Sequence, residues 1–190
     1  MPKTERREAE PSARAAQLSE AFRTDYRSYQ YRFVEFLVEH LADVSRTFSG
    51  DLQQVMVLAI LGQVRLRAVR EAATRGEAPA MRIQGDGTTA SRISDVTSIP
   101  RQTVRRKLLA LQKLGWVTQD DGGLWRIVAD ADGVATPVRR DLAGLDERAL
   151  LRIARLVADL EDLADRQSRA VAETRASTIA PPTGGKVRPP

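Results

Sequence analysis

The sequence contains no cysteine and one histidine, His40, among its 190 residues. Without cysteine the chain has no disulfide, no thiolate ligand for a metal and no thiol nucleophile. A single histidine without a carboxylate cluster makes no metal site, and it would have to serve as the base of any catalytic triad. We therefore expect no enzyme activity, no catalytic residue, no metal and no cofactor, and interpret His40 as a structural residue.

Long apolar runs are also lacking. No segment approaches the roughly 18 apolar residues of a membrane span, and the N-terminal stretch MPKTERREAEPSARAAQ has no apolar core of a signal peptide. We therefore expect a cytoplasmic protein without membrane contact. The 30 Lys and Arg residues exceed the 25 Asp and Glu residues and give a formal charge of +5, a tilt that favours an anionic partner.

The N-terminal part divides into an arm and a helix. Residues 1–17 are small and charged without apolar periodicity, which is typical of a disordered arm. From residue 18 to 48 large apolar side chains recur every three or four positions and predict one long amphipathic helix. Its wide aromatic stripe must be covered, either by the rest of its own domain or by a second subunit. Both alternatives stay open, so the helix is a candidate for dimerisation.

The middle and the end of the chain also have helical patterns. Asp51 can cap and Gly76 can end a helix that is apolar on more than one face, typical of a buried central helix. The stretch MRIQGDGTT predicts a short strand and a turn, because no Walker lysine follows its glycines. Residues 139–175 predict a C-terminal helix, capped by Asp146 and with a short heptad-like seam, that can pair between subunits or pack within one. Residues 176–190 are rich in Pro and Gly and predict a disordered tail.

One segment carries two helices joined by a tight turn. Ile93 and Val96 suit one face of a short helix, Thr97 and Ser98 interrupt it, and Pro100 suits the first turn of the next helix, where its missing N–H costs nothing. In that second helix Val104, Leu108 and Leu111 or Leu114 fall on one face, which leaves the cations on the others.

The same segment holds the chain's excess of positive charge. From residue 88 to 119 there are six cations and a single acid, Asp95, so the segment alone carries +5, the formal charge of the whole chain. A run of one sign without interspersed acids is more typical of a surface that meets a polyanion than of a merely solvated helix.

The stretch ISDVTSIPRQTVRRKLLALQKLGWV, followed by the glycine-turned hairpin WVTQDDGGLWRIV, resembles the helix-turn-helix and wing of bacterial winged-helix transcriptional regulators. The order of elements is similar to the MarR-type arrangement, in which N- and C-terminal helices flank the winged core and form a dimer. The resemblance implies a mainly α fold with a winged helix-turn-helix core over residues 50–130, a small β-hairpin wing and long flanking helices. Trp116 and Trp125 are then expected to pack the wing on the core.

The resemblance also implies roles for single residues. The helix over residues 100–114 would enter the major groove and bring Arg101, Gln102, Thr103, Arg105 or Arg106 nearest the bases. Lys107 and Arg92 would hold backbone phosphates. Two features depart from the pattern: Ser98 stands in the turn where glycine is frequent, and the wing tip offers Asp120 and Asp121, which leaves Arg126 as its one cation. The implied DNA-binding residues are Arg92, Ser98, Pro100, Arg101, Gln102, Thr103, Arg105, Arg106, Lys107 and Arg126.

These observations predict a homodimeric bacterial transcriptional regulator that binds double-stranded DNA at a near-palindromic site. Two alternatives remain: a winged-helix protein-interaction module, and an architectural or plasmid-type DNA-binding protein with little sequence preference. A regulator that responds to an unknown small-molecule effector is also open, because the apolar helices can enclose a pocket.

Overall fold

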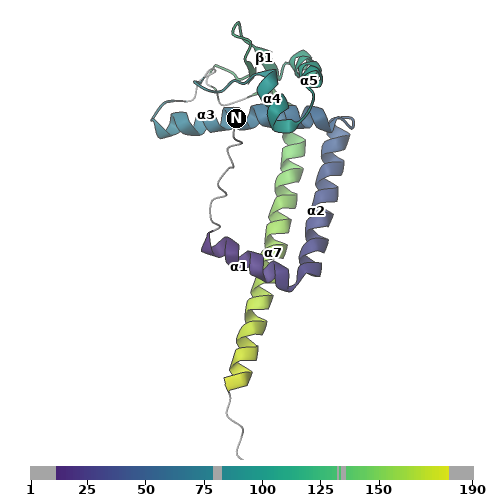
Figure 1. Cartoon of the computed structure of the whole chain (residues 1–190), viewed down its shortest axis with the longest axis vertical. Helices are drawn as coiled ribbons and strands as arrows, with labels where there is room; N and C mark the ends of the chain where they lie inside the picture. Colours follow the sequence, from purple (N-terminus) through teal and green to yellow (C-terminus); the bar gives the residue numbers. More distant parts are fainter. Residues whose placement is uncertain (1–11, 79–82, 132, 134–135, 180–190) are drawn as a thin grey trace, which may run out of the picture. The chain divides into compact units, whose positions relative to one another are not determined.

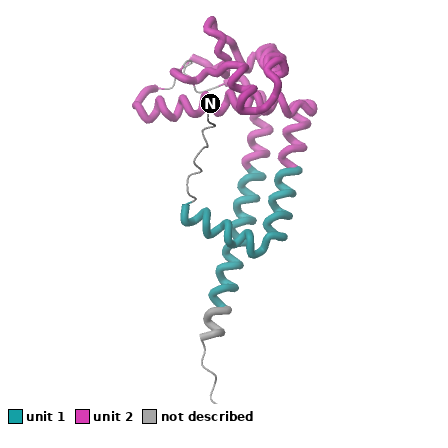
Figure 2. Tube along the Cα trace, viewed as in Figure 1, with its two compact units in different colours: residues 1–38, 151–190 teal, residues 39–150 magenta. Residues whose placement is uncertain are grey.

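A computed structural model describes residues 12–78, 83–131, 133 and 136–179, with side chains as far as residue 173. The chain divides into two compact units, one of residues 1–38 with 151–190 and the other of residues 39–150 (Figure 2). The fold is mainly helical with a two-stranded antiparallel sheet, as expected for a winged helix-turn-helix (Figure 1). In chain order the elements are α1 Ala13–Thr24, α2 Tyr26–Thr47, α3 Leu52–Thr74, α4 Ala90–Thr97, α5 Arg101–Lys113, β1 Val117–Gln119, β2 Trp125–Ile127, α6 Pro137–Asp141 and α7 Ala143–Ile179.

The core of the second unit is built on α3. Asp51 caps this helix, because its carboxylate accepts a hydrogen bond from the amide of Gln54 at 3.0 Å. In Figure 1 α4, α5 and β1 lie on one side of α3. Val57 and Leu61 of α3 are fully buried in one apolar cluster with residues of α4, α5 and the wing. Helix α3 is therefore central as expected, but it is buried on one face, because Leu52, Met56 and Leu66 are 43%, 45% and 67% exposed. It supports both helices of the helix-turn-helix.

Local signals set the two helices of the helix-turn-helix. The Thr89 hydroxyl accepts from the Arg92 amide at 3.2 Å and starts α4, and Pro100 stands as the N-cap of α5. Ile93, Val104 and Leu108 are fully buried between the two helices and α3. Burial of side chains of this size contributes about 1.5–3 kcal/mol each, so the interior faces of α4 and α5 are fixed by packing.

Ser98 forms the turn between α4 and α5 in the left-handed region, with φ 58° and ψ 12°. Its amide donates to the Ser94 carbonyl at 2.8 Å, and the Ser94 hydroxyl donates to the Ile99 carbonyl at 2.7 Å. A left-handed conformation costs a residue with a Cβ about 1 kcal/mol, which explains why glycine is frequent in this turn. Here the two hydrogen bonds hold the serine in place.

The wing is a short hairpin that leans on the core. Val117 pairs with Ile127 and Gln119 with Trp125, and Thr88 adds an isolated bridge to Trp125 through two backbone hydrogen bonds of 2.8 and 3.0 Å. Within the described residues the strand expected in MRIQGDGTT is therefore reduced to Thr88, since residues 81 and 82 lie outside them. The wing is thus held at its base by the segment that precedes α4.

The two tryptophans pack the wing as expected. Trp116 is 8% exposed and Trp125 is 5% exposed. The Trp116 indole nitrogen donates to the Asp141 carboxylate at 2.7 Å, and its ring meets Phe48 edge to face with centroids 6.1 Å apart. Both rings are therefore structural, and neither is available to stack on bases or on a ligand.

The N-terminal helix differs from the expectation in two ways. It is broken at Asp25, whose carboxylate accepts from the Ser28 amide at 3.3 Å, because an aspartate bonds the backbone amides that open a new helix. Helix α1 also begins at Ala13, before the expected start at residue 18, since Ser12 accepts from the Ala15 amide at 3.2 Å. The expected arm up to residue 17 is thus helical from Ala13, and its first eleven residues lie outside the described ones.

The C-terminal helix also differs from its predicted ends. It opens as α6, capped by Thr136, and resumes as α7 at Ala143, so that Asp146 lies in the first turn of α7 and is not its cap. The Asp146 amide already donates to the Leu142 carbonyl at 3.0 Å, which places the residue inside the helix. Helix α7 runs to Ile179, past the predicted end at residue 175, because no helix breaker precedes the prolines at 181 and 182. The remaining tail, residues 180–190, lies outside the described residues.

Each unit has an ion pair that joins α2 and α7. In the first unit Arg32 bonds Asp159 at 2.6 Å. In the second unit Arg148 bonds the buried Asp43 through two hydrogen bonds of 2.9 and 3.1 Å. The hydrogen bonds that Arg148 donates to Asp43 raise the pKa of Arg148 above its ordinary value, although burial opposes this shift. A paired guanidinium and carboxylate of this kind fix the orientation of two helices more strictly than an apolar contact does.

Candidate nucleic-acid interface

The outward face of α5 carries a concentration of polar and cationic side chains. Val104, Leu108 and Leu111 are each 0% exposed, so at 3.6 residues per turn the opposite side of the helix must face solvent. Arg101, Gln102, Arg105 and Arg106 are exposed there, and Thr103 is half-buried. These residues lie in the first two turns of the helix.

Four arginines of this region make no ion pair in the described part of the chain, although Arg106 lies close enough to Asp51 to help lower its pKa. Arg92 on α4 and Arg101, Arg105 and Arg106 on α5 are exposed, and none makes an ion pair within 4.0 Å. We call these four residues the arginine face. Their guanidinium groups keep all five N–H donors directed to solvent or to a partner. Such a surface is suited to phosphates and to the edges of guanine bases.

The start of α5 adds to this positive field. The first turn of α5 contains no acidic residue, and Pro100 gives no side-chain hydrogen bond to its amides. The positive end of the helix dipole therefore faces the same side as Arg101 and Gln102. Ser98 and Pro100, both expected at the interface, are exposed and set the turn and the first residue of α5.

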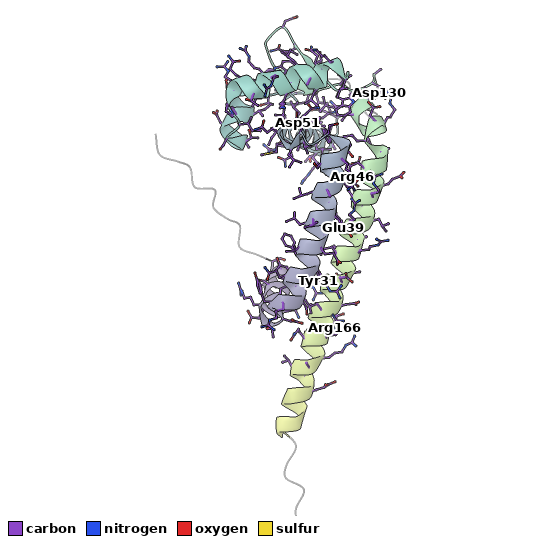
Figure 3. All side chains as sticks on the ribbon, turned by 90° about the vertical axis from the view of Figure 1, so that its right-hand side faces the viewer. Tyr31, Glu39, Arg46, Asp51, Asp130 and Arg166 are labelled. Carbon is purple, nitrogen blue, oxygen red and sulfur yellow. The ribbon has the colours of Figure 1, made fainter. Side chains whose placement is uncertain are left out.

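Lys107 does not belong to the arginine face. Its ammonium group bonds the carboxylate of Asp51, the cap of α3, which Figure 3 labels, and its side chain is 15% exposed. Although burial favours the neutral acid, hydrogen bonds from Lys107 and from the Gln54 amide lower the pKa of Asp51 below its ordinary value. The charge of Lys107 is balanced inside the protein. We expected Lys107 to hold a backbone phosphate, whereas in the structure it fastens α5 to α3.

Arg126, the one cation expected on the wing, is likewise bonded inside the protein. Its guanidinium donates to the Asp120 carboxylate at 2.7 and 3.1 Å and to the carboxylate of Asp86, which leaves its side chain 17% exposed. The hydrogen bond with Asp120 raises the pKa of Arg126, and the same bond lowers the pKa of Asp120. We expected Arg126 to contact DNA, whereas in the structure its guanidinium closes the wing.

Asp86 is the residue at the centre of this network, and sequence reasoning missed it. Its side chain is 1% exposed and forms ion pairs with Arg65 of α3, at 3.3 Å, and with Arg126 of the wing. Its carboxylate also accepts a hydrogen bond from the Ile83 amide at 3.2 Å. A Cβ at Gly87 would lie 3.0 Å from the Arg126 guanidinium carbon, so the glycine leaves room for that side chain. The one available signal was Arg65, a charge on a mostly apolar helix that needs a partner once it is buried.

Two classes of site receive no support from the described residues. Residues 12–78, 83–131, 133 and 136–179 contain no group of three or more His, Asp or Glu side chains arranged to hold a metal ion. Within the same ranges α3 is the one helix with the length and composition of a membrane span. It is the core helix of the second unit, with Arg65 buried in an ion pair on it.

Comparison with known families agrees with this geometry. Residues 80–121 match the family model of the IclR helix-turn-helix domain, a range that contains α4, α5 and β1. No curated protein and no solved structure matches the chain. The chain thus has an IclR-type helix-turn-helix DNA-binding domain, whose function is sequence-specific binding of double-stranded DNA by a bacterial transcriptional regulator. The match covers the helix-turn-helix and leaves the flanking helices unassigned.

Proposed function

We propose that this chain regulates transcription as a homodimer, with α5 as the recognition helix in the major groove. The observation that carries the proposal is the arginine face: four exposed arginines without an ion-pair partner among the described residues, on the segment that matches a DNA-binding family. Charges that a protein leaves unbalanced on one rigid face are suited to a polyanion.

Within this proposal the residues of α4 and α5 contact different parts of the DNA. Arg101 and Arg105 or Arg106 have paired donors that suit the acceptors of a guanine edge, and Gln102 has the donor and acceptor that suit an adenine edge. Thr103 contacts a thymine methyl group or a phosphate, and Arg92 on α4 holds a phosphate. Ser98 and Pro100 set the angle at which α5 leaves the turn.

The first unit supports a dimer arranged like that of MarR-type regulators. Its part of α2 exposes a dense set of large apolar side chains, among them Tyr31 at 67% (labelled in Figure 3) and Val38 at 61%, and its part of α7 exposes Ile153 and Val157. An apolar surface of this extent is unfavourable in water unless another protein surface covers it. A second copy of the chain brings the same surface to a symmetric interface. Two recognition helices then meet half-sites about one turn of DNA apart.

The rest of the proposal follows from the DNA-binding role. A regulator that binds the chromosome works in the cytoplasm of a bacterium. We assign it no catalytic activity, because the arginine face carries no nucleophile paired with a base and the lone histidine lies on α2.

The test is selection of duplexes from a random pool at about physiological salt. Wild type is compared with Arg105→Ala/Arg106→Ala and with Arg67→Ala/Arg70→Ala, which removes two exposed arginines of α3 and causes the same loss of charge. We expect an inverted-repeat consensus for wild type and for the α3 variant, and none for the α5 variant. Enrichment that is equal in all three proteins would contradict the proposal and favour an architectural DNA binder. Failure of wild type to enrich any duplex would favour the protein-interaction module.

A further inference from the structure

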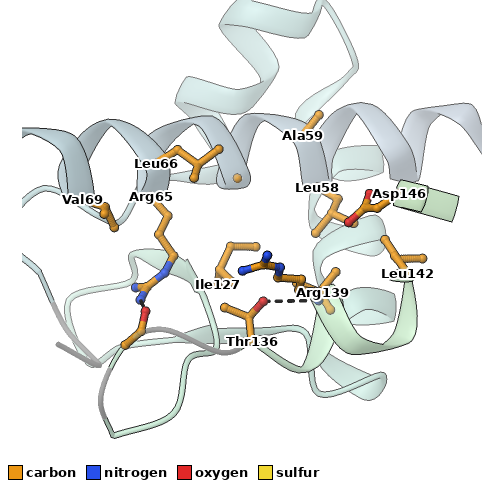
Figure 4. Close-up of a pocket in the computed structure, with 13 residues that line it drawn as sticks. Leu58, Ala59, Arg65, Leu66, Val69, Ile127, Thr136, Arg139, Leu142 and Asp146 are labelled. Carbon is orange, nitrogen blue, oxygen red and sulfur yellow. Dashed lines mark hydrogen bonds between the residues drawn. The ribbon is translucent and has the colours of Figure 1, made fainter. Parts of the chain in front are cut away.

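A cavity of about 560 Å³ lies in the second unit between α3, the wing and α6 (Figure 4). Its walls are mainly apolar and include Leu58 and Leu66 of α3, Ile127 of β2 and Leu142 beside α6. None of the four residues of the arginine face lines it. Cavities of roughly 300–1,000 Å³ with apolar walls and a few polar groups are typical binding sites for small molecules.

One cation, the exposed Arg139, points into this apolar space. Figure 4 shows the guanidinium of Arg139 directed between Ile127 and α3, while the backbone amide of Arg139 donates to the Thr136 hydroxyl at 3.3 Å and fixes the start of α6. Arg139 makes no ion pair with any residue that the structure describes. A guanidinium beside apolar walls favours a carboxylate or sulfonate, which it binds through paired hydrogen bonds.

A single anionic group fits the lining better than two. Asp146 also lines the cavity, at the end near Leu58 and Leu142 (Figure 4), and its carboxylate repels a second anion there. The apolar walls between Arg139 and Asp146 require an apolar body on the same molecule. The cavity is therefore complementary to a small apolar molecule with one acidic group at one end.

Two residues that line the cavity are connected to the wing, one along the chain and the other through ion pairs. Ile127, a lining residue, follows Arg126 in β2. Arg65, a second lining residue, bonds the buried Asp86, and Asp86 bonds Arg126, which in turn holds Asp120 at the turn of the wing. A molecule in the cavity thus contacts Arg65, at the α3 end of this network, and Ile127, the neighbour of Arg126 in β2.

We propose that this cavity is the effector site of the regulator and that it binds a small apolar monoanion, with the acid group on Arg139 and the apolar body against Leu58, Leu66 and Ile127. Occupancy shifts the wing through Ile127 and the Arg65–Asp86–Arg126 network and so changes DNA affinity. The second statement rests on the proposed function, whereas the first concerns binding alone and is measured without DNA.

Gly62 allows a variant that fills the cavity without disturbing the fold. It lines the cavity from α3, and a Cβ placed on it would meet no atom within 4 Å. Replacing a helical glycine by leucine also favours the helix. Gly62→Leu therefore occupies the space of a ligand and keeps α3 intact, while Arg139→Gln removes the charge and leaves the volume. Arg140→Gln, an exposed neighbour outside the lining, is the matched control.

The test is a fluorescence titration of the full chain with 8-anilinonaphthalene-1-sulfonate, followed by competition with naphthalene-2-carboxylate and with the neutral naphthalene-2-methanol. We expect saturable binding to wild type and Arg140→Gln, a loss of about tenfold in Arg139→Gln, equal to about 1.4 kcal/mol, and no saturable binding in Gly62→Leu. The carboxylate should compete and the alcohol should not. Equal binding to all four proteins would place the probe on another apolar surface and overturn the proposed site.

DNA affinity is then measured with and without naphthalene-2-carboxylate. The proposal predicts a change of about fivefold or more for wild type and none for Gly62→Leu. Unchanged DNA affinity in a protein that binds the probe would overturn the regulatory role and leave the binding site standing. Absence of DNA binding without any ligand would contradict the proposed function, and the titration would still decide the cavity.

Discussion

Two groups of cations in the second unit behave in opposite ways, although both are made of arginine or lysine. Arg65, Lys107 and Arg126 are largely buried, and each is bonded to an aspartate of another element. Arg101, Arg105 and Arg106 are exposed and have no ion pair among the described residues. The difference shows that an excess of cations indicates a DNA-binding surface only when the cations in internal ion pairs are left out of the count.

The largest effect on stability should come from the centre of the first group. Asp86→Ala leaves Arg65 and Arg126 without their shared carboxylate, and removing one partner of a buried ion pair costs about 3–5 kcal/mol. The free energy of unfolding, measured by urea denaturation, should fall by that amount. Asp121→Ala removes an exposed acid of the same wing and serves as the control. Equal, small losses in both variants would mean that Asp86 does not organise the wing.

A smaller loss is expected at the start of α3. Asp51→Ala removes a helix cap and the partner of Lys107 and should reduce the free energy of unfolding by about 1–2 kcal/mol. A double-mutant cycle with Lys107→Met separates the two contributions. A coupling energy of zero would show that Lys107 is free for another partner, and the boundary between the two groups of cations would then be misplaced.

The same aspartate gives a pH dependence of known sign. The pKa of Asp51 is lowered in the folded protein, so its contribution is present above the ordinary value of 3.8 and is lost as pH falls through the lower folded value. The urea midpoint of wild type should therefore fall below about pH 4, and Asp51→Asn should show a shallower decline. Identical pH profiles for the two proteins would contradict the internal pairing of Asp51.

The smallest expected effect concerns the turn that presents the arginine face. Ser98→Gly relieves a left-handed serine and should raise the free energy of unfolding by about 1 kcal/mol or less. DNA affinity should not change, because Ser98 acts through the backbone. Weaker binding of the operator by Ser98→Gly, measured by gel shift, would show that its hydroxyl contacts DNA.

The sequence predicts the features of this fold that depend on neighbouring residues, and it does not predict contacts between residues far apart in the chain. The helices α3, α4 and α5 and the hairpin follow from caps, apolar spacing and glycines that act over a few residues, as at Asp51 and Pro100. The pairing of Lys107 with Asp51 and of Arg65 with Asp86 joins residues far apart in sequence, and no local pattern indicates it. Lys107 and Arg126 were therefore assigned to DNA from their charge alone.

The break at Asp25 and the ends of α7 were missed for a different reason. In the sequence, an aspartate such as Asp25 can lie on the surface of one continuous helix or can cap the start of a second helix. Which of the two forms depends on the packing of the aromatic residues around it. Phe22 of α1 stacks on Tyr29 of α2 across this break with centroids 5.1 Å apart, and Tyr29 stacks on Phe33 within α2 with centroids 6.0 Å apart. Apolar periodicity alone continues through Asp25, so it predicts one helix where there are two.

The central claim is that the arginine face, and not the internally paired cations, meets DNA phosphates and bases. The most direct measurement is the slope of the logarithm of DNA affinity against the logarithm of salt concentration for wild type, Arg105→Ala/Arg106→Ala and Lys107→Met. Each phosphate contact contributes roughly 0.9 to that slope, so the double variant should have a slope smaller by about 1–2, while Lys107→Met should keep the wild-type slope. A slope that falls for Lys107→Met and stays unchanged for the double variant would contradict the claim.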